Sequence, residues 1–166
     1  MNLGRMLKHL AMPDWTVRRA FPARIGAAVV QAVRALEKSH DVELKVAVEG
    51  GLPPAALLRG VTSRERAVDL FSQLRVWDTA NNTGVLIYLQ FADRKIEIVA
   101  DRGISARVRQ EEWDAACAAM AEEFRAGRYE QGALAGIEHV RALLAKHLAP
   151  PPPGDRDELP DEPVVI

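Results

Sequence analysis

The hydrophobic pattern is clearest between residues 84 and 104. Residues 86–89, followed by Phe91, form a nearly continuous apolar run, which is typical of a strand that is covered on both faces. Residues 95–101 then alternate between polar and apolar side chains, as in a second, half-buried strand. The sequence therefore predicts two consecutive strands separated by a short turn.

The turn residues suggest a register for this hairpin. If Asp93 and Arg94 form a two-residue turn, Leu89 faces Ile98 across the strands. The neighbouring pairs are then Phe91 with Ile96 and Gln90 with Glu97. Apolar residues meet apolar residues and polar residues meet polar ones, which a one-residue slip would spoil.

The rest of the chain shows mainly helical periodicity. A capping box, Thr62-Ser63-Arg64-Glu65, marks the start of one helix. Gly127 is suited to end another because glycine takes the left-handed conformation readily. Residues 42–48 alternate and predict one more strand. The expected helices cover residues 2–11, 22–39, 62–74, 113–124 and 130–147.

This order of elements predicts the fold class. A strand–helix–strand unit should have parallel strands and a right-handed crossover, and the hairpin adds an antiparallel strand. We expect a three-layer α/β/α sandwich, in which a small mixed sheet carries helices on both faces.

Bulk composition narrows the function classes. The 166 residues are 48% hydrophobic and 27% charged, as in an ordinary globular domain. The net charge of −1 lacks the electrostatic footprint of a nucleic-acid partner. The single cysteine, Cys117, is compatible with a reducing compartment. With no apolar segment of spanning length and no signal-like start, we expect a cytoplasmic protein.

Charge divides the chain into three parts: a basic segment with a short helix at 1–19, the α/β/α domain at 20–149, and an acidic, proline-rich tail at 150–166. The basic segment either touches acidic lipid or a partner, or packs on its own domain as a surface helix, which is the favoured interpretation. The tail is predicted to be disordered. Its last residues, Val164–Ile166, form either a docking peptide or an apolar end without a role, and the second is favoured.

Several motifs together carry a family resemblance that covers residues 20–148. Each is weak alone, but their order and spacing are specific. They are Trp77 with Asn82, Gly84–Leu89, Asp93–Lys95, Ile98–Ile104, Trp113, Met120, Phe124–Gly132 and Gly136–Ile137. On these residues the chain resembles a soluble bacterial branch of the TPM domain family. Where many members have a Trp-Gly-x-Gly turn, this chain has Trp77-Asp78-Thr79-Ala80.

The resemblance implies an α/β/α domain. It also implies divalent-cation binding in some members and weak acid phosphatase activity in some. Other members are accessory or quality-control modules of membrane complexes, which implies a protein partner.

The best candidate site lies where the outer ends of the hairpin meet. Asp78, Asn81, Asn82 and Asp101 offer the oxygen ligands that Ca²⁺ or Mg²⁺ prefers. The alternative is that these residues only cap helices and shape turns.

Trp77, Thr79 and Arg102 are the candidate lining of a pocket or partner surface. For Trp77 the favoured interpretation is instead a hydrophobic plug over the sheet end. For Arg102 it is a surface ion pair.

Other chemistry has little support. No serine lies in a Gly-x-Ser-x-Gly motif, and Cys117 falls on an inward helix face, as a packed, inert thiol would. The four histidines show no metal-ligand spacing, and there is no phosphate-binding glycine loop.

Two functions stay open: an accessory interaction module tuned by Ca²⁺ or Mg²⁺, and a weak metal-dependent acid phosphatase. They differ in whether Asp78 and Asp101 converge on a cleft or form local caps.

Overall fold

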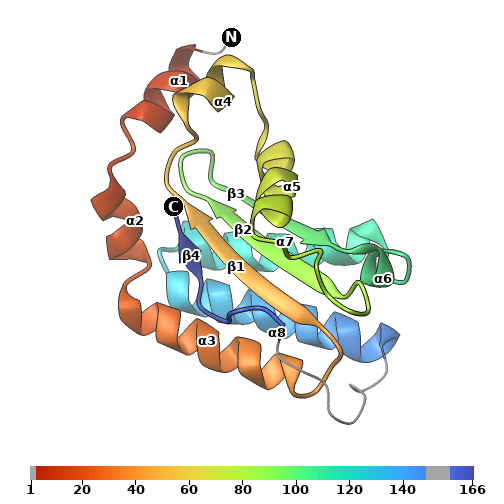
Figure 1. Ribbon diagram of the computed structural model, residues 1–166. Helices are drawn as coiled ribbons and strands as arrows, with labels where there is room; N and C mark the ends of the chain where they lie inside the picture. Colours follow the sequence, from red (N-terminus) through yellow and green to blue (C-terminus); the bar gives the residue numbers. More distant parts are fainter. Residues whose placement is uncertain (1–2, 149–157) are drawn as a thin grey trace.

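A four-stranded mixed sheet forms the centre of the molecule (Figure 1). The computed structural model describes residues 3–148 and 158–166. The strands are β1 (Glu43–Glu49), β2 (Gly84–Gln90), β3 (Lys95–Ala100) and β4 (Val164–Val165), in the order β3-β2-β1-β4. β1 runs parallel to β2 and β4, and β2 pairs antiparallel with β3. The mixed sheet expected from the sequence is therefore confirmed.

Helices cover both faces of the sheet, as the predicted sandwich requires. α3, α7 and α8 share a hydrophobic core with one face, and α5 packs on the other. The helices are α1 (Leu3–Leu10), α2 (Asp14–Ala20), α3 (Ala23–Glu37), α4 (Pro54–Leu58), α5 (Ser63–Gln73), α6 (Arg102–Ser105), α7 (Gln110–Arg125) and α8 (Tyr129–His147).

Strand alternation decides which side chain enters which core. On β2, Ile87 and Leu89 pack toward α3, α7 and α8, while Leu86 and Tyr88 pack toward α5. Because both faces are covered, every residue of β2 is buried. This explains the continuous apolar run in the sequence.

Two local signals act as predicted. The Oγ1 atom of Thr62 accepts a hydrogen bond from the Glu65 N–H at 3.2 Å, and a Glu65 carboxylate oxygen accepts one from the Thr62 N–H at 2.8 Å. Gly127, with φ of 74°, follows the end of α7 in the left-handed conformation.

The hairpin register differs from the prediction by two residues. Leu89 pairs with Ile96, and Ile87 pairs with Ile98. Phe91 is not in the ladder; its N–H donates to the Glu49 carbonyl of β1 at 3.0 Å, and the turn closes through Arg94 in the left-handed conformation. The predicted two-residue turn was wrong because a shift of two residues leaves every side chain on the same face, so the hydrophobic pattern could not exclude it.

The predicted disorder of the 150–166 tail is wrong for residues 158–166. Residues 150–157 lie outside the described residues. Val164 and Val165 pair with Ala47 and Val48 as β4, and the Ile166 N–H donates to the Val48 carbonyl at 2.8 Å. The open edge of β1 supplies these backbone hydrogen bonds, which the tail's composition did not reveal. The apolar end thus docks on the chain's own sheet.

Among residues 3–148 and 158–166, no helix combines the length and the apolar character that crossing a bilayer would require.

Candidate functional site

The hairpin brings two polar segments together as the sequence predicted. The Gly103 N–H donates to the Asn82 carbonyl at 3.0 Å, and Arg102 Nε donates to Asn82 Oδ1 at the same distance. The Asp101 N–H donates to the Gly84 carbonyl at 2.8 Å. Residues 77–83 and 101–103, with Asp41, are called the loop end below.

Local backbone geometry makes this approach possible. Asn82 has a φ of 56°, in the left-handed region that asparagine tolerates better than most residues. A Cβ atom on Gly103 would lie 2.5 Å from the Asn82 carbonyl oxygen and 2.7 Å from that of Asn81. Only glycine therefore allows the two segments to lie this close without a shift.

Asp41 joins the loop end, although sequence reasoning missed it. Asn81 Nδ2 donates to one of its carboxylate oxygens at 3.0 Å, and the Thr83 hydroxyl lies 3.4 Å from the other. A signal was available: Asp41 precedes β1, and the amino ends of parallel strands meet at one edge of the sheet. Glu43 is indeed paired with Gly84.

The two aspartates of the predicted cation site make local contacts. Asp101 is the N-cap residue of α6, and its Oδ1 accepts a 2.6 Å hydrogen bond from the Arg102 N–H. Asp78 forms an ion pair with Arg75, three residues earlier in the chain. In the described part of the chain, no three His, Cys, Asp or Glu side chains are grouped so as to hold a metal ion.

A hard cation at the loop end would therefore depend on a mixed donor set. Asp41 and Asp101 would supply carboxylates, and Asn81 and Asn82 would supply the carbonyl oxygens that face Gly103. The Asn82 side-chain oxygen already accepts from the Arg102 guanidinium, whose positive charge would oppose a cation there. Of the two cations, Ca²⁺ would suit such a mixed set better than Mg²⁺, because Ca²⁺ accepts irregular sets of oxygen ligands.

Trp77 is 49% exposed, so it does not plug the sheet end. Val76, fully buried, fills that place instead. A Cβ atom on Gly84 would lie 1.8 Å from the Val76 carbonyl oxygen, so the glycine lets Val76 approach the start of β2. The indole of Trp77 is left on the surface of the loop end.

The other two candidate surface residues shape the loop. Thr79 Oγ1 accepts a 2.9 Å hydrogen bond from the Thr83 N–H. Arg102 bonds the Asn82 amide rather than a carboxylate, so the predicted surface ion pair is replaced by a polar link between the two segments. From the tail, Glu158 accepts a 2.9 Å hydrogen bond from the Ala80 N–H.

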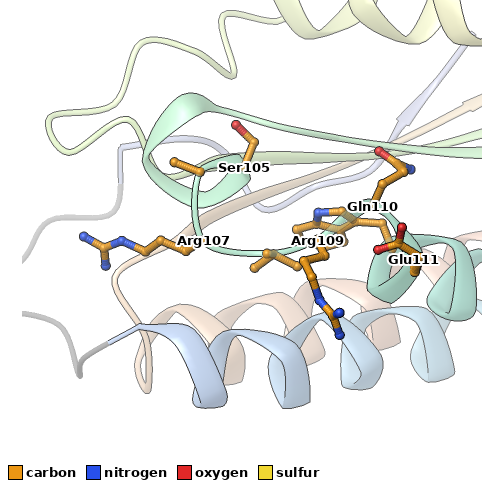
Figure 2. A pocket seen from close by; sticks show the side chains of 8 residues that line it. Ser105, Arg107, Arg109, Gln110 and Glu111 are labelled. Atoms are coloured by element: carbon orange, nitrogen blue, oxygen red, sulfur yellow. The ribbon is translucent and has the colours of Figure 1, made fainter.

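An open hollow of about 510 Å³ lies next to the loop end, between α6 and α7. Figure 2 shows the side chains of Ser105, Arg107 and Arg109 projecting in different directions around it. At the amino end of α7, the Glu112 carboxylate turns back and accepts from the Arg109 N–H at 3.2 Å. The hollow therefore lacks the convergent polar groups of a catalytic cleft.

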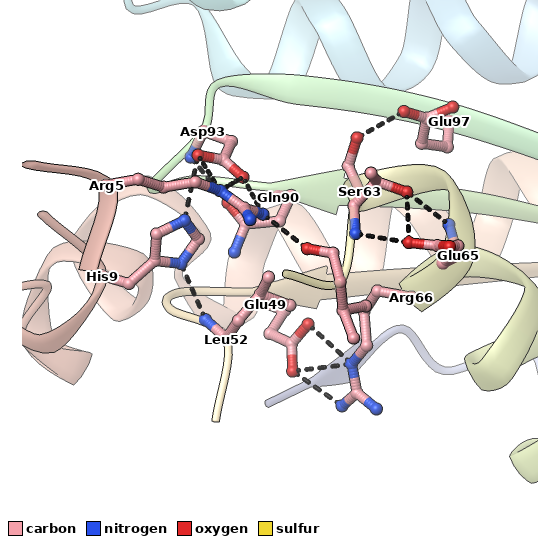
Figure 3. Close-up of polar contacts among 12 residues, drawn as sticks. Arg5, His9, Glu49, Leu52, Ser63, Glu65, Arg66, Gln90, Asp93 and Glu97 are labelled. Carbon is pink, nitrogen blue, oxygen red and sulfur yellow. Dashed lines mark hydrogen bonds and ion pairs between the residues drawn. The ribbon is translucent and has the colours of Figure 1, made fainter. Parts of the chain in front are cut away.

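A second polar network, which sequence reasoning missed, lies at the opposite end of β2 (Figure 3). The carboxylate of Glu49, 1% exposed, accepts hydrogen bonds from Arg66 at 2.7 and 3.1 Å and from the Tyr88 hydroxyl at 2.5 Å. Burial and the neighbouring Glu49 both raise the pKa of Tyr88. Arg66 and Tyr88 both donate hydrogen bonds to the buried Glu49 carboxylate. The network therefore stabilises this carboxylate and does not leave it free to react.

Asp93 anchors α1 to the same end of the sheet. Arg5 Nη2 lies 2.8 Å from Asp93 Oδ2, and His9 Nε2 lies 2.9 Å from Oδ1. The other ring nitrogen of the buried His9 accepts from the Leu52 N–H at 2.9 Å. Burial alone would raise the pKa of Asp93, but the hydrogen bonds from Arg5 and His9 lower it below the usual value.

Comparisons with known proteins show which family and which solved structures this chain is similar to. A family model described as the TPM domain matches residues 22–143. The NMR structure of BA42, from the psychrophilic bacterium Bizionia argentinensis, is 32% identical with a TM-score of 0.74, over 86% of this chain and 93% of that one. The N-terminal domain of a P. gingivalis protein shares the fold at 21% identity and a TM-score of 0.57, over 72% and 74% of the two chains. No curated protein matches the sequence.

Proposed function

The chain belongs to the TPM domain family, and we propose that it is an accessory interaction module whose partner, a protein of a membrane-associated assembly, binds the loop end. The observation that carries the proposal is the half-exposed Trp77 in the loop whose Asn82 side chain binds Arg102. Tryptophan and arginine are the residue types that most often dominate the binding energy of protein interfaces.

The surroundings of Trp77 favour recognition over catalysis. Gly84 and the buried Val76 fix the loop, and the Thr79 hydroxyl and Glu158 carboxylate bind backbone N–H groups within it. Such a pre-ordered surface loses little conformational entropy when a partner binds.

The phosphatase alternative has less support. A metal-dependent phosphomonoesterase would need carboxylates that converge on a metal ion, or a positioned nucleophile. Asp101 caps α6 and Asp78 pairs with Arg75, so their contacts favour the interaction module.

Weak Ca²⁺ binding is part of the proposal, with Mg²⁺ as the competing ion. Asp41 and Asp101 would supply the charge, and Asn81 and Asn82 the neutral oxygens. A bound cation would repel the Arg102 guanidinium, which binds the Asn82 side chain, and so alter the surface that the partner meets. A cytoplasmic setting also belongs to the proposal; it is compatible with a single cysteine, which is half-buried here.

Photo-crosslinking tests the partner surface. A photoreactive residue replaces Trp77 in one variant and the exposed Val68 of α5 in a matched control. We expect one partner to crosslink from position 77 only, and its binding to weaken at least about tenfold in Trp77→Ala. Equal crosslinking from both positions, or unchanged binding by Trp77→Ala, would refute the proposed surface.

Calorimetry tests the cation. Ca²⁺ and Mg²⁺ are titrated into the wild type, Asp101→Ala and Asp41→Asn, with Asp114→Asn on the exposed face of α7 as the control. We expect the wild type and the Asp114→Asn control to show binding heat with Ca²⁺. Asp101→Ala and Asp41→Asn should show none. Identical heats in all four proteins would remove the cation site.

A further inference from the structure

α1 carries an exposed apolar stripe. Leu3, Leu7 and Leu10 follow helical spacing and are 54–60% exposed. Trp15, at the start of α2, and Leu58, in α4, are 63% and 64% exposed. These five, all in α1, α2 or α4, account for more than half of the exposed large hydrophobic side chains in the described part of the chain, and Trp15 also lines a surface hollow next to the start of α8.

The opposite face of α1 holds the helix in place. Met6 packs against a small core of α4 that contains Leu52 and Leu57. Arg5 and the buried His9 bind Asp93 in the hairpin turn (Figure 3). Because these contacts fix the helix, the leucines are not needed for its attachment, and they face outward in a fixed orientation. Figure 1 shows α1 and α4 together at one end of the molecule.

Basic side chains accompany the apolar stripe. Residues 1–24 contain five basic residues against a single aspartate, and Lys8, Arg18 and Arg19 are exposed. A second copy docking through the same face would bring like charges together, which disfavours self-association. Exposed leucines with tryptophan and basic residues are instead the composition of helices that lie in an anionic bilayer interface.

We propose that α1 and the start of α2 dock on a membrane surface that contains anionic lipid. Leu3, Leu7, Leu10 and Trp15 enter the boundary between headgroups and acyl chains, and Lys8, Arg18 and Arg19 bind the lipid phosphates. No segment crosses the bilayer in this arrangement. The contact is reversible because only one short helix and one indole are inserted.

This inference is independent of the loop-end proposal. β2 starts at the loop end and finishes next to the turn that α1 holds through Asp93. The two surfaces therefore lie at opposite ends of the hairpin, and docking by α1 would turn the loop end away from the membrane.

Vesicle co-sedimentation tests the contact with phosphatidylcholine vesicles that contain or lack phosphatidylglycerol. We expect about tenfold stronger binding to the anionic vesicles, weakened by added salt. Leu7→Ser/Leu10→Ser and Arg18→Glu/Arg19→Glu should each reduce this binding about tenfold or more. The control Val68→Ser, an exposed apolar change on α5, should bind as the wild type does. Circular dichroism checks that each variant is folded.

A second measurement follows the fluorescence of Trp15, the indole that is proposed to enter the membrane. On anionic vesicles the tryptophan emission should shift to shorter wavelength, and Trp15→Phe should remove the shift while Trp77→Phe keeps it. Trp77→Ala and Asp101→Ala should bind vesicles normally, so failure of the loop-end proposal would leave this result unchanged. Equal binding to both vesicle types, binding that survives loss of the leucines, or leucine-dependent self-association in the ultracentrifuge would each overturn the inference.

Discussion

Arg34 and Asp161 form an ion pair of 2.6 Å between Nε and Oδ2, although 127 positions separate them in the sequence. Asp161 is 3% exposed, and the pair joins the tail to α3. We expect Asp161→Ala to lower the free energy of unfolding by about 1–3 kcal/mol, because the charge-assisted hydrogen bond between the tail and α3 is lost. Urea unfolding measures this loss.

The neighbouring acid provides the control for that change. Glu162→Ala removes an exposed carboxylate from the same segment and should have a much smaller effect. In Asp161→Ala, the Gly50 N–H, which donates to the Ile166 carbonyl at 3.2 Å, should exchange faster with solvent. Equal exchange and stability in both variants would contradict an anchoring role for Asp161.

Glu37 predicts a pH dependence of stability. Burial raises its pKa to about 9, with Glu43 and Asp161 adding to the rise. The folded protein keeps this proton where the unfolded chain, with a value of 4.5, has released it. The contribution of Glu37 to the free energy of unfolding should therefore be largest below about pH 4.5 and should decrease as the pH rises to about 9. Glu37→Gln should flatten this decline in urea unfolding measured across that range, whereas the exposed Glu122→Gln should not.

The capping box of α5 has a measurable contribution. Thr62→Ala removes the hydroxyl that accepts from the Glu65 N–H, so we expect a loss of about 1 kcal/mol in the free energy of unfolding. Thr62→Ser keeps the acceptor and should retain most of the stability. Chemical denaturation compares the two variants, and equal losses would exclude the hydrogen bond as the cause.

Cys117 should be a slow nucleophile. Burial, then the nearby Glu97 and Asp114, raises the pKa of its thiol to about 11 from 9. At mildly alkaline pH the folded protein thus holds about a hundred times less thiolate than an unperturbed cysteine. A chromogenic disulfide reagent should react slowly with the native protein and rapidly in urea. Rapid reaction in the folded state would show that the thiol is accessible.

The phosphatase alternative is tested with a chromogenic phosphate ester, with and without Mg²⁺. We expect no hydrolysis that depends on Asp78 or Asp101, because both carboxylates make local contacts. Asp78→Ala and Asp101→Ala should leave any residual rate unchanged, which would identify it as background. Mg²⁺-dependent turnover that both substitutions abolish would restore the enzyme hypothesis.

The sequence predicted the sheet well because its signals are local. The apolar run of β2, the alternation in β3 and the capping box at Thr62 each depend on residues within one segment. The meeting of the two polar segments followed from the hairpin alone, and it survived the error in register because the outer ends of the strands stay together.

What the sequence did not reveal depends on contacts between distant segments. β4 pairs with the edge of β1, and Asp93 binds Arg5 and His9 across 88 and more than 80 positions. In both cases the sequence around one segment gives no indication of the distant segment that it contacts. The buried Val76 took the place expected for Trp77, because only the close approach at Gly84 distinguishes the two.

The pairing of β1 with β4 has a consequence for biosynthesis. β1 leaves the ribosome long before Val164 and Val165, its partners on this edge, have been made. This edge of the sheet therefore stays unpaired in the nascent chain until β4 has been synthesised. During that interval the strand is open to wrong partners, and this is when a chaperone would be most useful to the chain.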